Sequence, residues 1–134
     1  MKIFGIGTDI VKTNRIQKLL RKENILEKLF NEEEIIKCKR IKKNANCFAK
    51  RFAAKEAFSK AIGTGISKGI NFNEIIVINN SKGKPNIKLI GKTKIIINKM
   101  IKKKFNVLLT LSDDKPFAIA TVIISLWKKK ELQI

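Results

Sequence analysis

One stretch of the chain, residues 51–65, limits most strongly what this sequence can fold into. It is apolar nearly all the way round a helix, yet it carries four charged side chains, Arg51, Lys55, Glu56 and Lys60. A helix that is apolar on every side is normally buried, and buried charges are costly unless they are paired or bind an ion. Arg51 and Lys55 are like charges four residues apart, so we expect something anionic beside them. Glu56 points in another direction, where it is able to hold a cation.

The composition favours an anionic partner without deciding which kind. The chain has 134 residues, enough for one domain with a single core, and its formal net charge is +19. Such a charge attracts an acidic protein, a phosphorylated ligand or nucleic acid. We do not favour nucleic acid, because most of the basic residues are lysines and neither arginines nor exposed aromatic rings are clustered. A basic nucleic-acid-binding module without enzymatic activity is the alternative.

Several classes of site are excluded by the residue types that are present. The chain contains no histidine, which excludes a histidine base, a histidine metal ligand and a Ser-His-Asp triad within it. Cys38 and Cys47 match no zinc spacing and no disulfide framework, so we expect both to be reduced, ordinary residues. The N-terminus does not resemble a signal peptide, and the longest apolar run, residues 117–127, is too short to span a bilayer. We therefore expect a soluble cytoplasmic protein.

Strands and helices alternate in the hydrophobic pattern. Strands are predicted at residues 2–11, 74–78, 86–90, 105–112 and 117–126. Helices are predicted at residues 15–22, 31–41, 47–62 and 92–103. The pattern predicts an α+β fold, in which a mainly antiparallel sheet is packed by a long central helix and shorter helices. Residues 1–126 form a single domain in this prediction, and residues 127–134 form a charged C-terminal tail.

Details of the pattern make further predictions about individual elements. The first strand is apolar on both faces, which favours a central position in the sheet. Asn31 and Glu34 have the spacing of a capping box, and Gly63 is placed to end the long helix. The last two strands are predicted to form a hairpin. In the helix at residues 92–103, one side is predicted to carry the apolar residues Ile95, Ile96 and Met100.

Only two of the eleven carboxylates lie within strongly apolar segments, Asp9 and Glu56. Taken singly, Asp9 is explained as a residue that caps the following helix. Glu56 is explained by a salt bridge to Lys60, which contributes about 0.3–0.5 kcal/mol. Taken together, they predict a site for a hard cation, because two carboxylates without histidine or cysteine suit Mg²⁺. The prediction requires that these two residues, far apart along the chain, meet in the fold.

A set of motifs, in order and with matching spacing, is similar to those of a known family. Residues 5–11 (Gly-Ile-Gly-Thr-Asp-Ile-Val) and residues 51–65 are the most specific, and residues 83–85 (Gly-Lys-Pro) and 109–112 (Leu-Thr-Leu-Ser) follow. They resemble the motifs of the holo-[acyl-carrier-protein] synthases, the small single-domain bacterial type of 4'-phosphopantetheinyl transferase. The resemblance covers residues 2–126, and it implies the fold of that family.

The resemblance also implies a reaction and a set of roles. The 4'-phosphopantetheine arm of coenzyme A would pass to a serine of apo acyl carrier protein, for fatty acid biosynthesis, and 3',5'-ADP would leave. Asp9 and Glu56 would bind Mg²⁺, with Mn²⁺ as the alternative, and Lys60 would stabilise the developing charge. Glu56 itself or a water on the metal would take the serine proton. Coenzyme A contacts are implied for Arg51, Lys55, Gly63, Gly65 and Ser112.

Partners follow from the same resemblance. An acidic apo acyl carrier protein would dock on the first helix, at its basic residues Arg15, Lys18, Arg21 and Lys22. The alternative is an ordinary solvated helix face. A homotrimer is expected, with residues 117–126 in its interface, and neither a membrane nor nucleic acid is expected as a partner.

One position departs from the family pattern. The family has a histidine where this chain has Asp113, which makes an inactive relative kept as a scaffold a third possibility.

Overall fold

The computed structural model describes residues 1–63 and 69–127 and shows an α+β fold. The elements follow in the order β1 (Lys2–Lys12), α1 (Thr13–Leu19), α2 (Ile25–Leu29), α3 (Glu32–Lys39), α4 (Ala45–Ile62), the 3-10 helix η2 (Phe72–Glu74), β2 (Ile75–Asn79), β3 (Pro85–Leu89), α5 (Gly91–Ile101), β4 (Phe105–Asp114) and β5 (Phe117–Leu126). Strands β1, β5 and β4 form one antiparallel sheet in that order, and β2 pairs antiparallel with β3. The predicted fold class is therefore confirmed, with two sheets.

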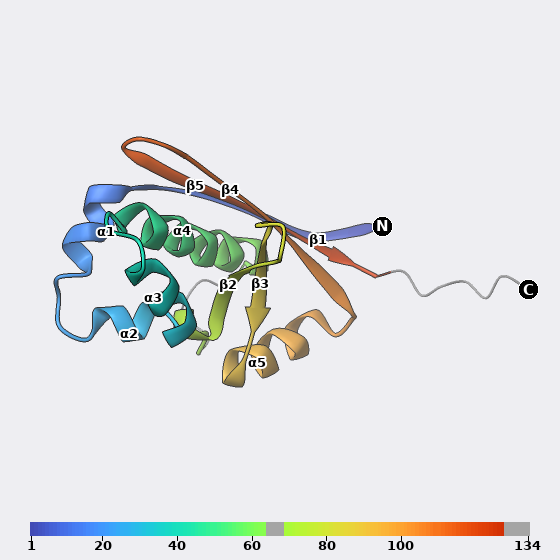
Figure 1. Ribbon diagram of the computed structural model, residues 1–134. Coiled ribbons are helices and arrows are strands. Elements are labelled where there is room, and N and C mark those ends of the chain that lie inside the picture. Colours follow the sequence, from blue (N-terminus) through green and yellow to red (C-terminus); the bar gives the residue numbers. More distant parts are fainter. Residues whose placement is uncertain (64–68, 128–134) are drawn as a thin grey trace, which may run out of the picture.

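Helix α4 is buried on nearly every side because it is packed between layers. The three-stranded sheet lies along one side, and α1, α3 and β2 surround it elsewhere (Figure 1). Aromatic side chains fill the remaining space: Phe48 lies 5.0 Å from Phe30 and Phe52 lies 6.0 Å from Phe72, ring centre to ring centre. Across residues 1–63 and 69–127, no helix has the length and apolar character needed to cross a membrane.

Three local predictions are confirmed. Asn31 caps α3 and forms the capping box with Glu34. Gly63 ends α4 with a φ of 90°, a left-handed conformation that glycine adopts without steric cost. Strands β4 and β5 form the hairpin, paired from Phe105–Leu126 to Asp114–Phe117. Gly65 and residues 128–134 lie outside the described residues, so the prediction of a charged tail stays a prediction.

The predicted central position of β1 is wrong. Strand β5 has a neighbour on both sides, and β1 lies at an edge of the sheet. The apolar residues that suggested a second buried face, Ile3, Ile6 and Ile10, are 51%, 65% and 57% exposed. An apolar outer face therefore has the same sequence pattern as a strand buried on both faces.

Two helical details also differ from the prediction. Helix α5 buries Thr93, Ile97 and Ile101. Of the three predicted residues, Ile96 and Met100 are partly buried against the core, whereas Ile95 is exposed. The orientation follows from Thr93, whose hydroxyl donates a hydrogen bond to Glu74 and accepts one from the Asn71 amide. The short helix α2, which was not predicted, occupies the segment between α1 and α3.

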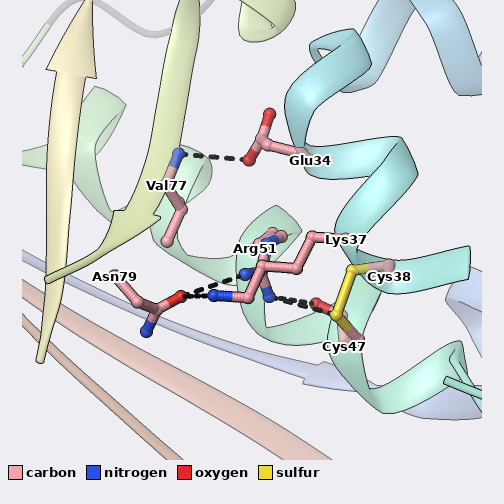
Figure 2. Close-up of a disulfide and its surroundings, with 7 residues drawn as sticks. All are labelled: Glu34, Lys37, Cys38, Cys47, Arg51, Val77 and Asn79. Carbon is pink, nitrogen blue, oxygen red and sulfur yellow. Dashed lines mark hydrogen bonds between the residues drawn. A yellow bond between two sulfur atoms is a disulfide. The ribbon is translucent and has the colours of Figure 1, made fainter. Parts of the chain in front are cut away.

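The predicted reduced state of the cysteines is wrong. Cys38, in the last turn of α3, is bonded to Cys47, in the first turn of α4 (Figure 2). The capping-box helix and the long helix are therefore joined covalently across a nine-residue separation. The spacing of the two cysteines matches no known motif. The pairing was not predictable from it, because it depends on how α3 packs against α4.

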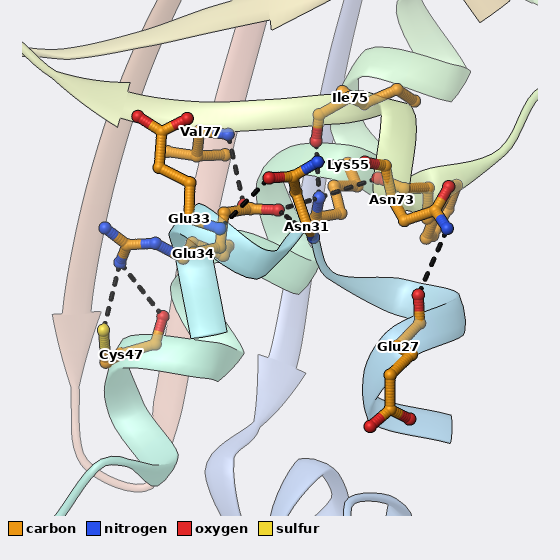
Figure 3. Close-up of polar contacts among 11 residues, drawn as sticks. Glu27, Asn31, Glu33, Glu34, Cys47, Lys55, Asn73, Ile75 and Val77 are labelled. Carbon is orange, nitrogen blue, oxygen red and sulfur yellow. Dashed lines mark hydrogen bonds and ion pairs between the residues drawn. The ribbon is translucent and has the colours of Figure 1, made fainter. Parts of the chain in front are cut away.

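The anion expected beside the α4 lysine is Glu34 of α3. The Lys55 ammonium lies 2.7 Å from Glu34 Oε1, and it also donates to the carbonyl oxygens of Phe72 and Ile75 (Figure 3). Glu34 Oε2 accepts the amide of Val77 at 3.1 Å. Burial lowers the pKa of Lys55 to about 8, although the charge of Glu34 acts against this. This fully buried pair ties α3, η2 and β2 to α4.

We predict that Lys55→Met lowers the free energy of unfolding by about 3–5 kcal/mol, because it leaves the Glu34 carboxylate buried without its cation. Urea unfolding measures the change. Lys50→Met is the matched control: Lys50 is on the same helix but is partly exposed in its ion pair with Asp113. The control should change stability by no more than about 0.5 kcal/mol. Equal effects of the two substitutions would contradict the assignment.

Glu74 of η2 caps the start of α5. Its carboxylate accepts hydrogen bonds from the Lys92 amide, from Thr93 and from the Asn71 side chain. Burial acts to raise the pKa of Glu74, but these hydrogen bonds outweigh it, and the net pKa lies below the ordinary 4.5. The ionised form is therefore favoured in the folded protein.

We predict that Glu74→Gln reduces stability more at about pH 6 than at about pH 3. The folded pKa is lowered, so the contribution of Glu74 is present above pH 4.5 and is lost as the pH falls through the folded pKa. Urea unfolding at both pH values measures it, with Glu23→Gln, an exposed carboxylate in a turn, as control. A pH-independent effect of Glu74→Gln would count against this capping role.

Candidate active site

The site begins with a close contact between β1 and α4 that two glycines permit. A Cβ atom at Gly7 would lie 2.0 Å from the carbonyl oxygen of Ala57, and one at Gly5 would lie 1.9 Å from that of Ala61. Real Cβ atoms do not approach backbone so closely, so any other residue would push the strand away from the helix. The Gly-x-Gly of the first motif thus brings the strand directly against the helix backbone.

This contact brings Asp9 to α4. Side chains alternate between the faces of a strand, so Gly5, Gly7 and Asp9 share the face toward the helix. On α4, Glu56 and Lys60 are one turn apart. Lys60 Nζ lies 3.1 Å from Asp9 Oδ1 and donates to the carbonyl oxygen of Thr8 at 3.0 Å. Lys60 therefore pairs with Asp9 and bridges the helix to the strand.

Glu56 lies in the field of several charges at this contact. Partial burial raises its pKa, and the negative charge of Asp9 raises it further. The positive charges of Lys60 and Arg15 act in the opposite direction. The two predicted acids are thus close enough to interact electrostatically, and Lys60 of α4 and Arg15 of α1 also act on Glu56.

The donor set at this contact fits a hard divalent cation. Asp9 and Glu56 offer carboxylate oxygens, and the mutual repulsion of their charges is the kind that a cation relieves. Within residues 1–63 and 69–127 there is no group of three or more histidine, cysteine or acidic residues that could hold a metal. Two protein ligands suit Mg²⁺, which keeps several waters and takes other ligands from substrate phosphates.

The predicted coenzyme A contacts have different surroundings. Lys55 is fully buried in its pair with Glu34, so we remove it from the set. Arg51 is 5% exposed and donates to Cys47 and to Asn79 Oδ1. Gly63 and Ser112 are exposed, at the end of α4 and on β4. Gly65 lies outside the described residues.

Asp113 turns toward the start of α4. Its carboxylate accepts a hydrogen bond from Asn46 Nδ2 at 3.1 Å and lies 3.6 Å from Lys50 Nζ. The side chain thus fastens the β4–β5 hairpin to α4. Its two partners satisfy the negative charge that the sequence departure introduced.

The predicted docking residues are all exposed. Arg15 and Lys18 lie on α1, and Arg21 and Lys22 lie in the turn that follows. Of these residues, Arg15 lies close enough to Glu56 for its positive charge to act on the Glu56 carboxylate.

Comparison with known proteins identifies the family. Residues 5–122 match the family model described as the 4'-phosphopantetheinyl transferase superfamily. The chain belongs to the 4'-phosphopantetheinyl transferase superfamily. Within it, a holo-[acyl-carrier-protein] synthase of Pelagibacter ubique (strain HTCC1062) is 46% identical over 125 residues, which cover 92% of this chain and 98% of that protein.

Solved structures of the superfamily share the fold. The holo-[acyl-carrier-protein] synthase of Neisseria meningitidis has a TM-score of 0.81 at 34% identity, covering 92% of this chain and 99% of that one. The enzyme of Bacillus anthracis str. Ames, in complex with CoA (3',5'-ADP), has a TM-score of 0.74 at 38% identity, covering 91% and 96%. The resemblance inferred from the motifs is therefore confirmed.

Two features of this superfamily member were missed in the sequence. Glu34 was predicted only as a capping residue, yet it is the counter-ion of Lys55. Glu34 directly follows Glu32 and Glu33, so nothing in the sequence distinguishes it from these two exposed acids. The bond from Lys60 to the Thr8 carbonyl has no sequence signal, because backbone oxygens are present everywhere.

We predict that Gly7→Ala disrupts the site and destabilises the fold, because the added methyl would overlap the Ala57 carbonyl. The expected loss in unfolding free energy is about 1–3 kcal/mol, which is typical of overpacking. Activity should fall by more than the fraction of unfolded protein explains. Gly83→Ala is the control: its methyl would meet nothing within 4 Å, so only the strain of a positive φ remains. Wild-type stability in Gly7→Ala would contradict the close contact.

Proposed function

We propose that the protein acts as a holo-[acyl-carrier-protein] synthase, transferring the 4'-phosphopantetheine arm of coenzyme A to a serine of apo acyl carrier protein and releasing 3',5'-ADP. The observation that carries the proposal is the convergence of Asp9, Glu56 and Lys60 at the contact of β1 with α4. Membership of the superfamily and near-full-length similarity to a holo-[acyl-carrier-protein] synthase support it.

The residues at this contact would divide the work as follows. Asp9 and Glu56 would hold Mg²⁺, or Mn²⁺ in its place. When bound, the metal supplies positive charge to the diphosphate oxygens and orients them. Lys60, held by Asp9 and the Thr8 carbonyl, stabilises the negative charge that develops on the leaving phosphate. Glu56 or a water beside it accepts the proton of the attacking serine hydroxyl.

The proposed contacts of coenzyme A are spread along α4, from Arg51 in its first half to Gly63 at its end, and include Ser112 of β4. We propose Arg51, Gly63, Gly65 and Ser112 as its contacts. The relative from Bacillus anthracis is described in complex with CoA (3',5'-ADP), which supports coenzyme A as the co-substrate here. Arg51 is the least exposed of the described contacts, at 5%.

The partners follow from charge and exposure. An acidic carrier protein fits the exposed basic residues Arg15, Lys18, Arg21 and Lys22, the proposed docking surface, of which Arg15 acts on the charge of Glu56. We also propose a homotrimer, supported by the exposed apolar residues Ile6, Ile10 and Leu108 on the three-stranded sheet. Its interface would include β5. A cytoplasmic location remains a prediction from the composition.

Neither alternative function gains support from a specific observation. A nucleic-acid-binding module gives no reason for Asp9 to pair with Lys60 across a glycine-lined contact, beside the second partly buried acid, Glu56. An inactive scaffold was suggested only by Asp113, whose charge is satisfied by Asn46 and Lys50.

We predict that Glu56→Gln and Asp9→Asn each lower kcat/KM for transfer by about 100-fold or more, because each removes one metal-binding charge. Purified protein is incubated with coenzyme A, Mg²⁺ and apo carrier protein, and the added arm is detected by mass. Glu23→Gln, which changes the net charge equally at an exposed turn, should leave the rate unchanged. Robust transfer by Asp9→Asn, or by wild type after chelation of metal, would refute the assignment.

We predict that Lys18→Glu and Arg21→Glu raise the KM for carrier protein about threefold to tenfold while leaving the KM for coenzyme A unchanged, because they reverse charge only on the docking surface. The effect should shrink at high salt. Lys99→Glu, an equal charge reversal on the exposed face of α5, is the control. An equal rise in KM for carrier protein with Lys99→Glu would contradict the docking surface, because it would show that the effect comes from net charge alone.

A further inference from the structure

The disulfide joins two helix ends next to a short exposed segment. Cys38 is fully buried and Cys47 is 7% exposed, whereas residues 39–43 between them are exposed. The chain contains no other cysteine, so each has only the other as a partner within one copy. Disulfides inside cells are uncommon, and those that occur usually sense or transfer redox equivalents.

An arginine lies directly against this disulfide. Arg51, one turn along α4 from Cys47, donates from Nη1 to Cys47 Sγ at 3.2 Å and to the Cys47 carbonyl at 3.3 Å (Figure 2). Its Nη2 donates to Asn79 Oδ1, an oxygen that also accepts from Lys37. Within residues 1–63 and 69–127, Arg51 Nε has no hydrogen-bond partner, and no carboxylate forms an ion pair with the guanidinium. The group is thus a buried cation held mainly by neutral acceptors and one sulfur.

This arrangement makes the two cysteines chemically unequal. A cation in contact with a cysteine sulfur, at the first turn of a helix, stabilises the thiolate form. Cys47 has both features, and Cys38, in the last turn of α3, has neither. Cys47 is also the more exposed of the two.

We propose that Cys38 and Cys47 form a redox-active pair that exchanges with small thiols and disulfides, and that the state of the pair sets the net charge beside Arg51. In reduction, an external thiolate bonds to Cys47 Sγ, the Cys38–Cys47 bond breaks, and Cys38 leaves as a thiolate that takes up a proton. A second external thiolate then attacks the external sulfur of the mixed disulfide, and Cys47 leaves as a thiolate beside Arg51. Two electrons pass to the pair, and the external thiols become a disulfide.

The state of the pair changes the charge beside Arg51. In the bonded form the sulfur is neutral and the guanidinium keeps its full positive charge. In the reduced form the Cys47 thiolate neutralises it, which disfavours an anionic ligand at the same guanidinium. Given the proposed function, in which Arg51 contacts coenzyme A, the bonded form binds coenzyme A more tightly.

The pair is tested by equilibrating the full chain in defined ratios of reduced and oxidised glutathione, alkylating free thiols and measuring intact mass. We expect one reversible transition in which both cysteines react together. In Arg51→Gln, reduction should require a ratio [GSH]²/[GSSG] at least about threefold higher, because the Cys47 thiolate loses its cation. Arg51→Lys keeps the charge, so its midpoint ratio should lie closer to that of wild type. Lys50→Gln should have the same midpoint ratio as wild type. A pair that stays fully bonded or fully reduced at all ratios, or an unchanged midpoint in Arg51→Gln, would overturn the proposal.

Coenzyme A binding tests the link to Arg51. Calorimetric titration of the bonded and reduced wild type at about pH 8 should show at least about threefold weaker binding to the reduced form. Cys47→Ser, which cannot form the pair, should bind equally with and without reductant. Equal affinity of the two wild-type forms would overturn the link to Arg51. Absence of coenzyme A binding in both forms would count against the proposed function, and the glutathione titration would still report on the pair.

Discussion

The close contact between β1 and α4 is the constraint on which the site depends. Gly5 and Gly7 let the strand lie against the carbonyl oxygens of Ala61 and Ala57, and any side chain there would hold the two elements apart. At this distance the next residue on the same face of the strand, Asp9, reaches the helix turn that carries Glu56 and Lys60. The acidic pair is thus created by the absence of side chains two and four residues earlier.

A second, fully buried interaction keeps α4 in place for that contact. Lys55 points away from the strand and joins Glu34, Phe72 and Ile75 on the opposite side of the helix. Two successive residues of one helix therefore have different roles. Lys55 stabilises the packing of α4 against α3 and β2, and Glu56 belongs to the candidate site. This explains why a helix that is apolar all round carries charges, since one is paired inside the protein and its neighbour faces the partly open contact.

Much of the fold was predictable because local signals agreed with the tertiary structure. The capping box at Asn31, the stop at Gly63 and the β4–β5 hairpin are set by residues close in sequence. The edge position of β1 was not predictable, because Ile6 and Ile10 on its outer face are as apolar as core residues. The carboxylate pair followed from the motifs, but the burial of Lys55 and the Cys38–Cys47 bond depend on how distant elements pack.

The most direct test of the central claim is binding of Mn²⁺, as a spectroscopic substitute for Mg²⁺, followed by electron paramagnetic resonance in the presence of coenzyme A. Wild type, Asp9→Asn, Glu56→Gln and the double variant form a thermodynamic cycle. The account predicts one site, weakened about tenfold or more by either single substitution, with the double variant little worse because both acids serve the same ion. The account would be contradicted if Asp9→Asn bound Mn²⁺ with wild-type affinity. It would also be contradicted if the losses in binding free energy of the two single variants simply added in the double variant.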